Sequence, residues 1–240
     1  MEKKQRKFLS AEWKYLIIAN YVIDPVLLQQ YIPANTEPDL WNGNCYVSLV
    51  GFLFHNTSVL GLKIPFHTNF EEINLRFYVK HFDNGNWKRG VVFIKEVVPR
   101  RMISFVANTF FNEQYITCAT KNSLLYTEED LSVEYKWRYR KKWNSLSVKA
   151  ASVAEDIPQS SEAEFITEHY WGYSKSASGK TTEYAVEHPR WRIHPVKQYR
   201  INCDFKNLYG THFAMLADTI PVSVFLAEGS AISVRNKRSL

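Results

Sequence analysis

Four polar side chains of the kinds that bind ligands occur at every second position near residue 75. They are Glu72, Asn74, Arg76 and Tyr78. The positions between them are apolar, namely Ile73, Leu75, Phe77 and Val79. Because successive side chains of a β-strand point to opposite faces, this pattern predicts one polar row and one apolar row. An arginine with an amide in such a row is suited to recognising a carboxylate or carbonyl group.

The polar row has two interpretations, a cavity wall or an ordinary solvated sheet face. In a cavity, Arg76 would hold an anionic or carbonyl group. Glu72, if removed from water, would have a raised pKa and could act as an acid or a base. His67 lies just upstream in a loop and is a further candidate, although a single loop histidine more often has a structural role.

The row needs a strand and a partner strand to position it. The expected strand spans about 70–82, and the Asn84-Gly85 pair that follows is a strong hairpin signal. The partner strand, 90–98, is apolar on both faces and is therefore expected to be buried on both sides. Its two charged residues, Lys95 and Glu96, would lie near the interior or reach solvent at the strand end. A buried lysine has a lowered pKa and could be a nucleophilic amine.

The composition is typical of a sheet-rich protein with a substantial core, since 45% of residues are hydrophobic and 15% are aromatic. Helices are expected at 25–31, 100–112, 160–171 and 205–210, and strand-like segments fill most of the remainder. We therefore predict one α+β, mostly β domain over residues 9–235. A basic tail at 1–8 and a short tail at 236–240 would flank it.

Composition also argues against several classes of protein. The three cysteines, Cys45, Cys118 and Cys203, are too widely spaced to indicate a metal site or a disulfide framework. No histidines have metal-ligand spacing, no glycine-rich nucleotide motif is present, and no apolar run could span a bilayer. The charged N-terminal segment does not resemble a signal peptide. We expect a soluble, cytoplasmic protein with no metal, no cofactor and no membrane partner.

A basic and aromatic segment at 135–143 is the one candidate for nucleic-acid binding. On a strand four of its five cations would share one face, and its four aromatic side chains would share the other. Base stacking requires both kinds on the same exposed face, so nucleic acid is not expected as a partner despite the net charge of +6. Whether the protein forms a homo-oligomer stays open.

Several motifs, read in order, resemble those of a known family. They are Ile64-Pro65-Phe66-His67, Glu72-Ile73-Asn74-Leu75-Arg76, Lys95-Glu96-Val97-Val98-Pro99 and Ala227-Glu228-Gly229-Ser230. Together they resemble the YqjF-like family of uncharacterised bacterial proteins, the domain of unknown function 2071, from about residue 9 onward. That family is grouped with the acetoacetate decarboxylase-like superfamily. The resemblance implies a curved antiparallel sheet that closes into a cone or barrel around a cavity, with a few peripheral helices.

The resemblance also bears on chemistry. In the decarboxylase a lysine forms a Schiff base with a β-keto acid, and a neighbouring lysine lowers its pKa. The corresponding place here follows the 100–112 helix and reads Asn112-Glu113-Gln114-Tyr115, without a lysine. This departure argues against Schiff-base decarboxylation and leaves Lys95, on another strand, as the one nearby substitute. Glu113, as a further acid or base, and Tyr115 join the residues expected near the cavity.

Three functions are therefore open. The first is binding of a small anionic or carbonyl-containing molecule in a polar cavity, with or without catalysis. The second is a non-catalytic structural or interaction protein whose polar row is satisfied internally. The third is an imine-forming lyase that uses Lys95. The first two differ in whether the row faces a cavity and whether Arg76 is paired.

Overall fold

The chain folds mainly into β-strands, as predicted. The computed structural model describes residues 6–111, 113–175 and 179–240. The strands are β1 (Lys7–Ile23), β2 (Glu37–Pro38), β3 (Cys45–Val59), β4 (Phe70–Asp83), β5 (Asn86–Val98), β6 (Tyr115–Thr117), β7 (Ala119–Tyr126), β8 (Asp130–Tyr139), β9 (Lys142–Ala151), β10 (Glu155–Asp156), β11 (Trp171–Lys175), β12 (Thr181–Glu187), β13 (Arg192–His194), β14 (Val196–Asn202), β15 (Ser223–Arg235) and β16 (Arg238–Ser239). The helices are α1 (Arg101–Phe111), α2 (Glu162–Thr167) and α3 (Phe205–Tyr209), with 3₁₀ helices η1 (Pro25–Tyr31) and η2 (Thr211–Ala217).

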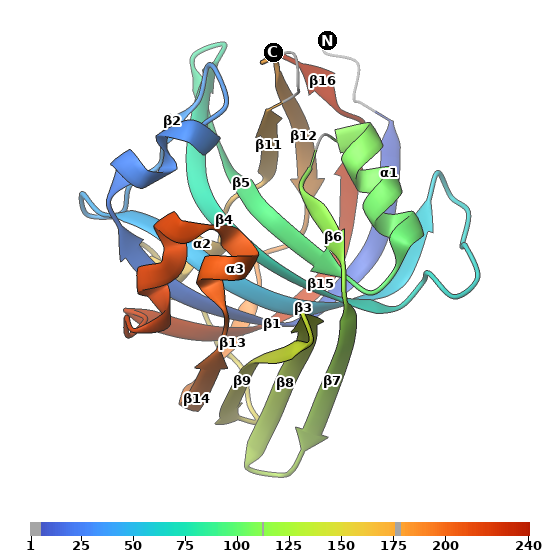
Figure 1. The fold of residues 1–240 in the computed structure, drawn as a ribbon, viewed down its shortest axis with the longest axis vertical. Helices are drawn as coiled ribbons and strands as arrows, with labels where there is room; N and C mark the ends of the chain where they lie inside the picture. Colours follow the sequence, from blue (N-terminus) through green and yellow to red (C-terminus); the bar gives the residue numbers. More distant parts are fainter. Residues whose placement is uncertain (1–5, 112, 176–178) are drawn as a thin grey trace.

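Seven of the described strands close into a ring. Its order is β15, β1, β3, β4, β5, β11 and β12 (Figure 1). The ring closes where β12 pairs with β15, through Val186 with Val234 and Glu187 with Ser233. Neighbouring strands are antiparallel, except that β5 and β11 run parallel. The curved sheet that was expected to close on itself is therefore present.

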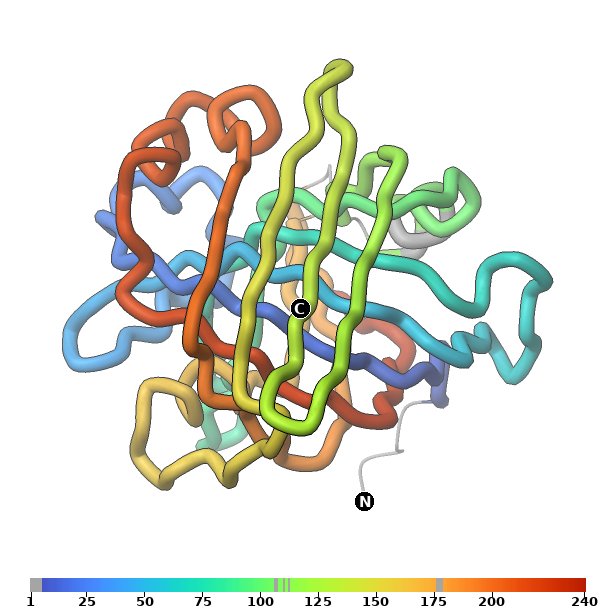
Figure 2. Tube along the Cα trace, turned by 90° about the horizontal axis from the view of Figure 1, so that it is seen from below, coloured from blue at the N-terminus to red at the C-terminus, as the bar shows by residue number. Residues whose placement is uncertain are grey.

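A second sheet packs against the outside of the ring. Strands β14, β9, β8 and β7 form it, and Figure 2 shows them crossing over β1 and β3. The apolar row of β4 points toward this sheet, so that Leu75 and Phe77 share an outer core with Tyr135 and Trp137. All four are fully buried. Burial of one Leu or Phe side chain stabilises a fold by about 1.5–3 kcal/mol, so this row anchors β4 firmly.

The opposite face of the ring strands forms an inner core. Phe52, Tyr78 and Val91 pack there against Phe165 of α2. The Ser161 hydroxyl caps the start of α2 by accepting from the Glu164 N–H at 3.2 Å. The polar row of β4 consequently faces the inside of the ring and not bulk water.

One irregularity in the β4–β5 pair changes which side chains reach each face. Leu75 pairs with Lys95, but the next residue, Arg76, pairs with Phe93. Ile94 is therefore an extra residue on β5, which is a β-bulge. The bulge shifts the alternation by one position, so that Glu96 faces inward and Lys95 faces the outer core.

Several element boundaries differ from the predictions. The N-terminal strand begins at Lys7, inside the expected tail, because it pairs with Arg235 of β15. The expected C-terminal tail contains β16, which pairs with β12. A hairpin turn with positive φ at Arg140 and Lys141 interrupts the strand expected at 131–143 and separates β8 from β9. Residue 112, the last of the expected 100–112 helix, lies outside the described residues.

None of the helices in the described ranges is long and apolar enough to cross a membrane.

Candidate ligand-binding site

A cavity of about 170 Å³ lies inside the ring. All seven ring strands contribute to its wall, which is largely apolar and rich in aromatic side chains such as Trp13, Phe54 and Trp171. Seven of the nine predicted site residues line it, namely His67, Glu72, Asn74, Arg76, Glu96, Glu113 and Tyr115. His67 belongs to the loop between β3 and β4, where its Nδ1 lies 2.8 Å from the Pro65 carbonyl oxygen. The polar row of β4 therefore meets the segment after α1 at one cavity.

Three glutamates in the wall are almost completely buried. The exposed fractions are 3% for Glu72, 1% for Glu96 and 6% for Glu113. The Tyr115 hydroxyl donates to Glu72 Oε2 at 3.0 Å. The Tyr184 hydroxyl donates to Glu113 Oε1 at 2.7 Å. Glu72 and Glu113 thus each accept from a buried phenol, and Glu96 lies close enough to both carboxyl groups to be repelled by them.

Burial changes the ionisation of this cluster. It raises the pKa of Glu72 to about 7 and that of Glu113 to about 8. For Glu96, burial and then repulsion from Glu113 and Glu72 raise the pKa well above its ordinary value. Low polarity and like charges both disfavour the ionised form. At neutral pH the cluster therefore retains protons and can donate as well as accept hydrogen bonds.

Arg76 supplies a cation beside these carboxyl groups, and only 7% of it is exposed. Its guanidinium carbon lies 5.7 Å from the centre of the Tyr78 ring. Among the described residues it has no hydrogen-bond or ion-pair partner, and its Nε is buried without one. Buried arginines are normally paired, because an unpaired buried charge costs several kcal/mol. This guanidinium is therefore available to an anion that the chain does not supply.

Two of the predicted site residues do not line the cavity. Tyr78 is fully buried behind the wall, with its hydroxyl 2.8 Å from that of Ser48, and its ring supports Arg76. Lys95 faces the outer core and donates to the Leu208 carbonyl. Burial lowers the pKa of Lys95, as expected for a lysine near the interior. The structure nevertheless corrects its placement, because the bulge at Ile94 directs it away from the cavity.

A histidine at the cavity escaped the sequence analysis. Nε2 of His169 lies 3.1 Å from Oδ2 of Asp39, which also accepts from Arg89 Nε at 2.6 Å. Burial lowers the pKa of His169 to about 4, so this imidazole is neutral at physiological pH. The three residues are far apart in the sequence and belong to no spaced motif. No local signal could have joined them.

The site was also inspected for a metal centre. Within the part of the chain that the structure describes, no group of three His, Cys, Asp or Glu side chains is arranged to hold a metal ion.

Comparison with known proteins places the chain in a family. An uncharacterized conserved protein family, DUF2071, matches residues 10–231. The chain belongs to this family. A curated relative, the uncharacterized protein YqjF of Bacillus subtilis (strain 168), is 29% identical over 111 residues. That match covers 46% of this chain and 44% of the relative, so it spans less than half of either protein. The resemblance inferred from the motifs is confirmed.

Solved structures share the fold at low sequence identity. An acetoacetate decarboxylase-like enzyme from Sphingomonas wittichii RW1 has a TM-score of 0.68 at 12% identity, over 98% of this chain and 94% of its own. The acetoacetate decarboxylase of Legionella pneumophila has a TM-score of 0.63 at 13% identity, over 100% and 92%. The enduracididine biosynthesis enzyme MppR, complexed with pyruvate, has a TM-score of 0.66 at 10% identity, over 99% and 91%. This family member therefore has the acetoacetate decarboxylase-like fold.

Proposed function

We propose that this protein binds a small molecule carrying a carboxylate or carbonyl group, and that Arg76 holds that group inside the ring. The observation that carries the proposal is the unpaired guanidinium, 7% exposed, in the wall of a cavity. A purely structural arginine would be expected to have carboxylate partners, as the buried ion pairs elsewhere in this chain do. An incoming carboxylate could pair with Arg76 through charge-assisted hydrogen bonds.

The rest of the wall limits the kind of molecule. Aromatic and aliphatic side chains make up most of the lining, including Phe52, Phe70 and Phe93. Pockets of this kind bind an apolar body and use a few polar groups to orient it. The ligand is therefore a small acid or carbonyl compound with an apolar portion. The presence of pyruvate in MppR, a neighbour of the same fold, agrees with this size class.

The proposal does not include imine chemistry. No lysine is among the described residues that line the cavity. Lys95, the nearby substitute, is engaged with Leu208 in the outer core. Borohydride treatment with a panel of keto acids should therefore leave the mass of the protein unchanged. A keto-acid adduct that disappears in Lys95→Ala would support the lyase function instead.

The binding proposal is tested by titrating straight-chain alkanoates and 2-oxo acids by calorimetry and thermal shift. Arg76→Met keeps the length and apolar body of the side chain but removes the cation. We expect at least one acid to bind, with affinity about 10–100-fold weaker in Arg76→Met. Arg200→Met, which removes an exposed arginine on β14, is the matched control and should bind as the natural chain does. Equal affinities in the two variants would refute the role of Arg76.

A further inference from the structure

Two buried oxygen atoms in the cavity wall have no hydrogen-bond partner among residues 6–111, 113–175 and 179–240. They are Oδ1 of Asn74 and Oε2 of Glu96. Each residue is only 1% exposed, and both line the cavity. They also face each other directly, since Asn74 on β4 pairs with Glu96 on β5. Asn74 and Glu96 are therefore neighbours in one cavity wall, and each offers a hydrogen-bonding atom that the described residues do not use.

The chain holds both side chains in place while leaving these atoms free. Asn74 Nδ2 donates to Glu72 Oε1 at 3.0 Å, which fixes the orientation of the amide and turns Oδ1 away from that bond. Glu96 is paired with Tyr115 of β6 in the sheet, which places the two residues side by side. Leaving a buried polar atom without a partner is energetically unfavourable, and two such atoms on neighbouring residues of a cavity wall add to that cost. A ligand group that bonds to both would offset that cost.

The hydrogen-bond donors and acceptors of Asn74 and Glu96 determine which ligand group can bind to both. Asn74 Oδ1 can only accept a hydrogen bond. Burial, with repulsion from Glu113 and Glu72, raises the pKa of Glu96 well above its ordinary value, which favours the protonated carboxyl group, a hydrogen-bond donor. A hydroxyl group donates one hydrogen bond and accepts others, and so matches both residues. An ammonium group has no lone pair to offer to a protonated carboxyl.

We propose that Asn74 and Glu96 together bind a hydroxyl group of a ligand whose carboxylate lies on Arg76, so that the cavity selects a hydroxy acid. This inference rests on the proposed function. Asn74 and Arg76 are two residues apart on β4, which places the two ligand positions roughly 7 Å apart. The hydroxyl therefore lies several bonds away from the carboxylate, and the carbon chain between them contacts the apolar wall.

The test compares alkanoates with their terminally hydroxylated counterparts by calorimetry at pH 6.5. The pairs are butanoate with 4-hydroxybutanoate, pentanoate with 5-hydroxypentanoate, and hexanoate with 6-hydroxyhexanoate. For one chain length we expect the hydroxy acid to bind about 3–10-fold more tightly than its parent, the gain typical of added hydrogen bonds. In water the hydroxyl is well solvated, so a non-specific apolar pocket would show the opposite preference.

Substitutions at Asn74 and Glu96 test whether these residues cause the tighter binding of the hydroxy acid. Asn74→Leu and Glu96→Leu should each bind the hydroxy acid no more tightly than its parent alkanoate, and a cooperative thermal transition shows that each variant is folded. Glu96→Gln, which keeps a donor and an acceptor at this position, should retain the preference. Equal binding of hydroxy acids and parents by the natural chain, or a preference that survives in both leucine variants, would overturn the inference and leave the role of Arg76 intact. If neither series binds, the proposed function fails as well.

Discussion

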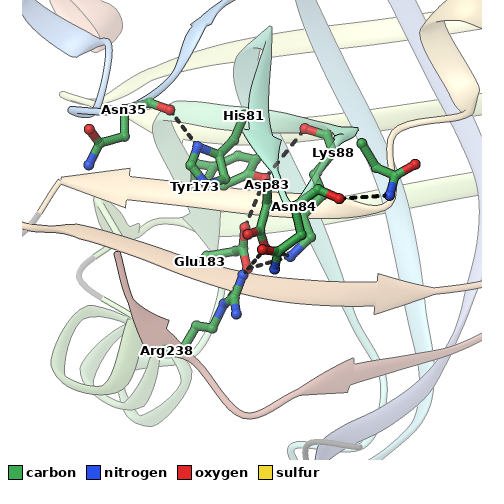
Figure 3. Close-up of polar contacts among 9 residues, drawn as sticks. Asn35, His81, Asp83, Asn84, Lys88, Tyr173, Glu183 and Arg238 are labelled. Carbon is green, nitrogen blue, oxygen red and sulfur yellow. Dashed lines mark hydrogen bonds and ion pairs between the residues drawn. The ribbon is translucent and has the colours of Figure 1, made fainter. Parts of the chain in front are cut away.

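Strands β4 and β5 contribute to two polar clusters that differ in burial and in how their hydrogen-bonding groups are paired. The first is the cavity cluster of Glu72, Asn74, Arg76 and Glu96, in which three side chains have a buried atom without a partner. The second lies near the hairpin turn and consists of Asp83, Lys88, Glu183 and Arg238 (Figure 3). We refer to the second as the ion-pair cluster.

In the ion-pair cluster each carboxylate has two cationic partners. Lys88 Nζ lies 2.5 Å from Asp83 Oδ2 and 3.4 Å from Glu183 Oε1, and Arg238 lies 2.6 Å from each carboxylate. Tyr173 adds a hydrogen bond to Glu183 Oε2 at 3.1 Å. These contacts tie the hairpin to β11, β12 and β16 (Figure 3). The ion-pair cluster therefore has its charges paired where it joins strands, whereas Asn74, Arg76 and Glu96 in the cavity wall each keep a buried atom without a partner among the described residues. This contrast is the basis for giving the ion-pair cluster a structural role and proposing a ligand-binding role for the cavity cluster.

The largest expected effect comes from breaking the ion-pair cluster. Glu183 is fully buried, and Glu183→Ala would leave Lys88 and Arg238 with one carboxylate between them. Loss of one partner from a buried ion pair costs about 3–5 kcal/mol, so we expect the free energy of unfolding to fall by that amount. Urea unfolding followed by fluorescence would measure it. The exposed Glu155→Ala on β10 is the matched control and should change stability by less than about 0.5 kcal/mol. A comparably small effect of Glu183→Ala would contradict the structural assignment.

The second expected effect is a dependence of stability on pH that originates in the cavity cluster. In the folded chain Glu72 and Glu113 have pKa values of about 7 and about 8, above the ordinary 4.5 of the unfolded chain. The folded state thus binds more protons, and stability falls as pH rises through these values. Between pH 6.5 and 8.5 we expect a loss on the order of 2–3 kcal/mol. His169, whose pKa is lowered to about 4 by burial, acts only below pH 6.5, where it opposes the trend.

Single substitutions test whether a cavity carboxyl group causes this pH dependence. Glu113→Gln keeps the shape of the side chain and the bond from Tyr184 but cannot ionise, so it should flatten the decline above pH 7. The exposed Glu128→Gln should leave the profile unchanged. A decline of equal size in both variants would mean that the carboxyl groups in the cavity do not cause it.

The polar row of β4 was predictable because strand alternation is a local property. Side chains two apart must share a face, and the unusual residue types of the row already indicated a site. The hairpin turn was predictable for the same reason, since Asn84-Gly85 readily adopts the positive φ values of 50° and 83° found there. The family resemblance then supplied the closed sheet, which no periodicity could have indicated.

Other parts of the site depend on the whole fold and could not be predicted. One extra residue in the β5 register, Ile94, exchanges the faces of all positions beyond it, and no sequence motif marks it. For that reason Glu96 reaches the cavity while Lys95 does not. Tyr184 and His169 meet the cavity only because distant strands close the ring. Local sequence patterns thus identified candidate site residues, and long-range packing determined which of these residues line the cavity.

The smallest expected effect is that of Arg76→Met on the free energy of unfolding, and it contrasts most strongly with that of Glu183→Ala. Arg76 is more deeply buried than Lys88 and Arg238 of the ion-pair cluster but has no partner among the described residues to lose. Replacing it with methionine removes the cost of burying an unpaired charge and keeps the apolar part of the side chain. In the absence of ligand, Arg76→Met should therefore leave the free energy of unfolding unchanged or raise it by up to about 1 kcal/mol. A destabilisation of 3 kcal/mol or more, on the scale of a broken buried pair, would mean that Arg76 serves the fold and not a ligand.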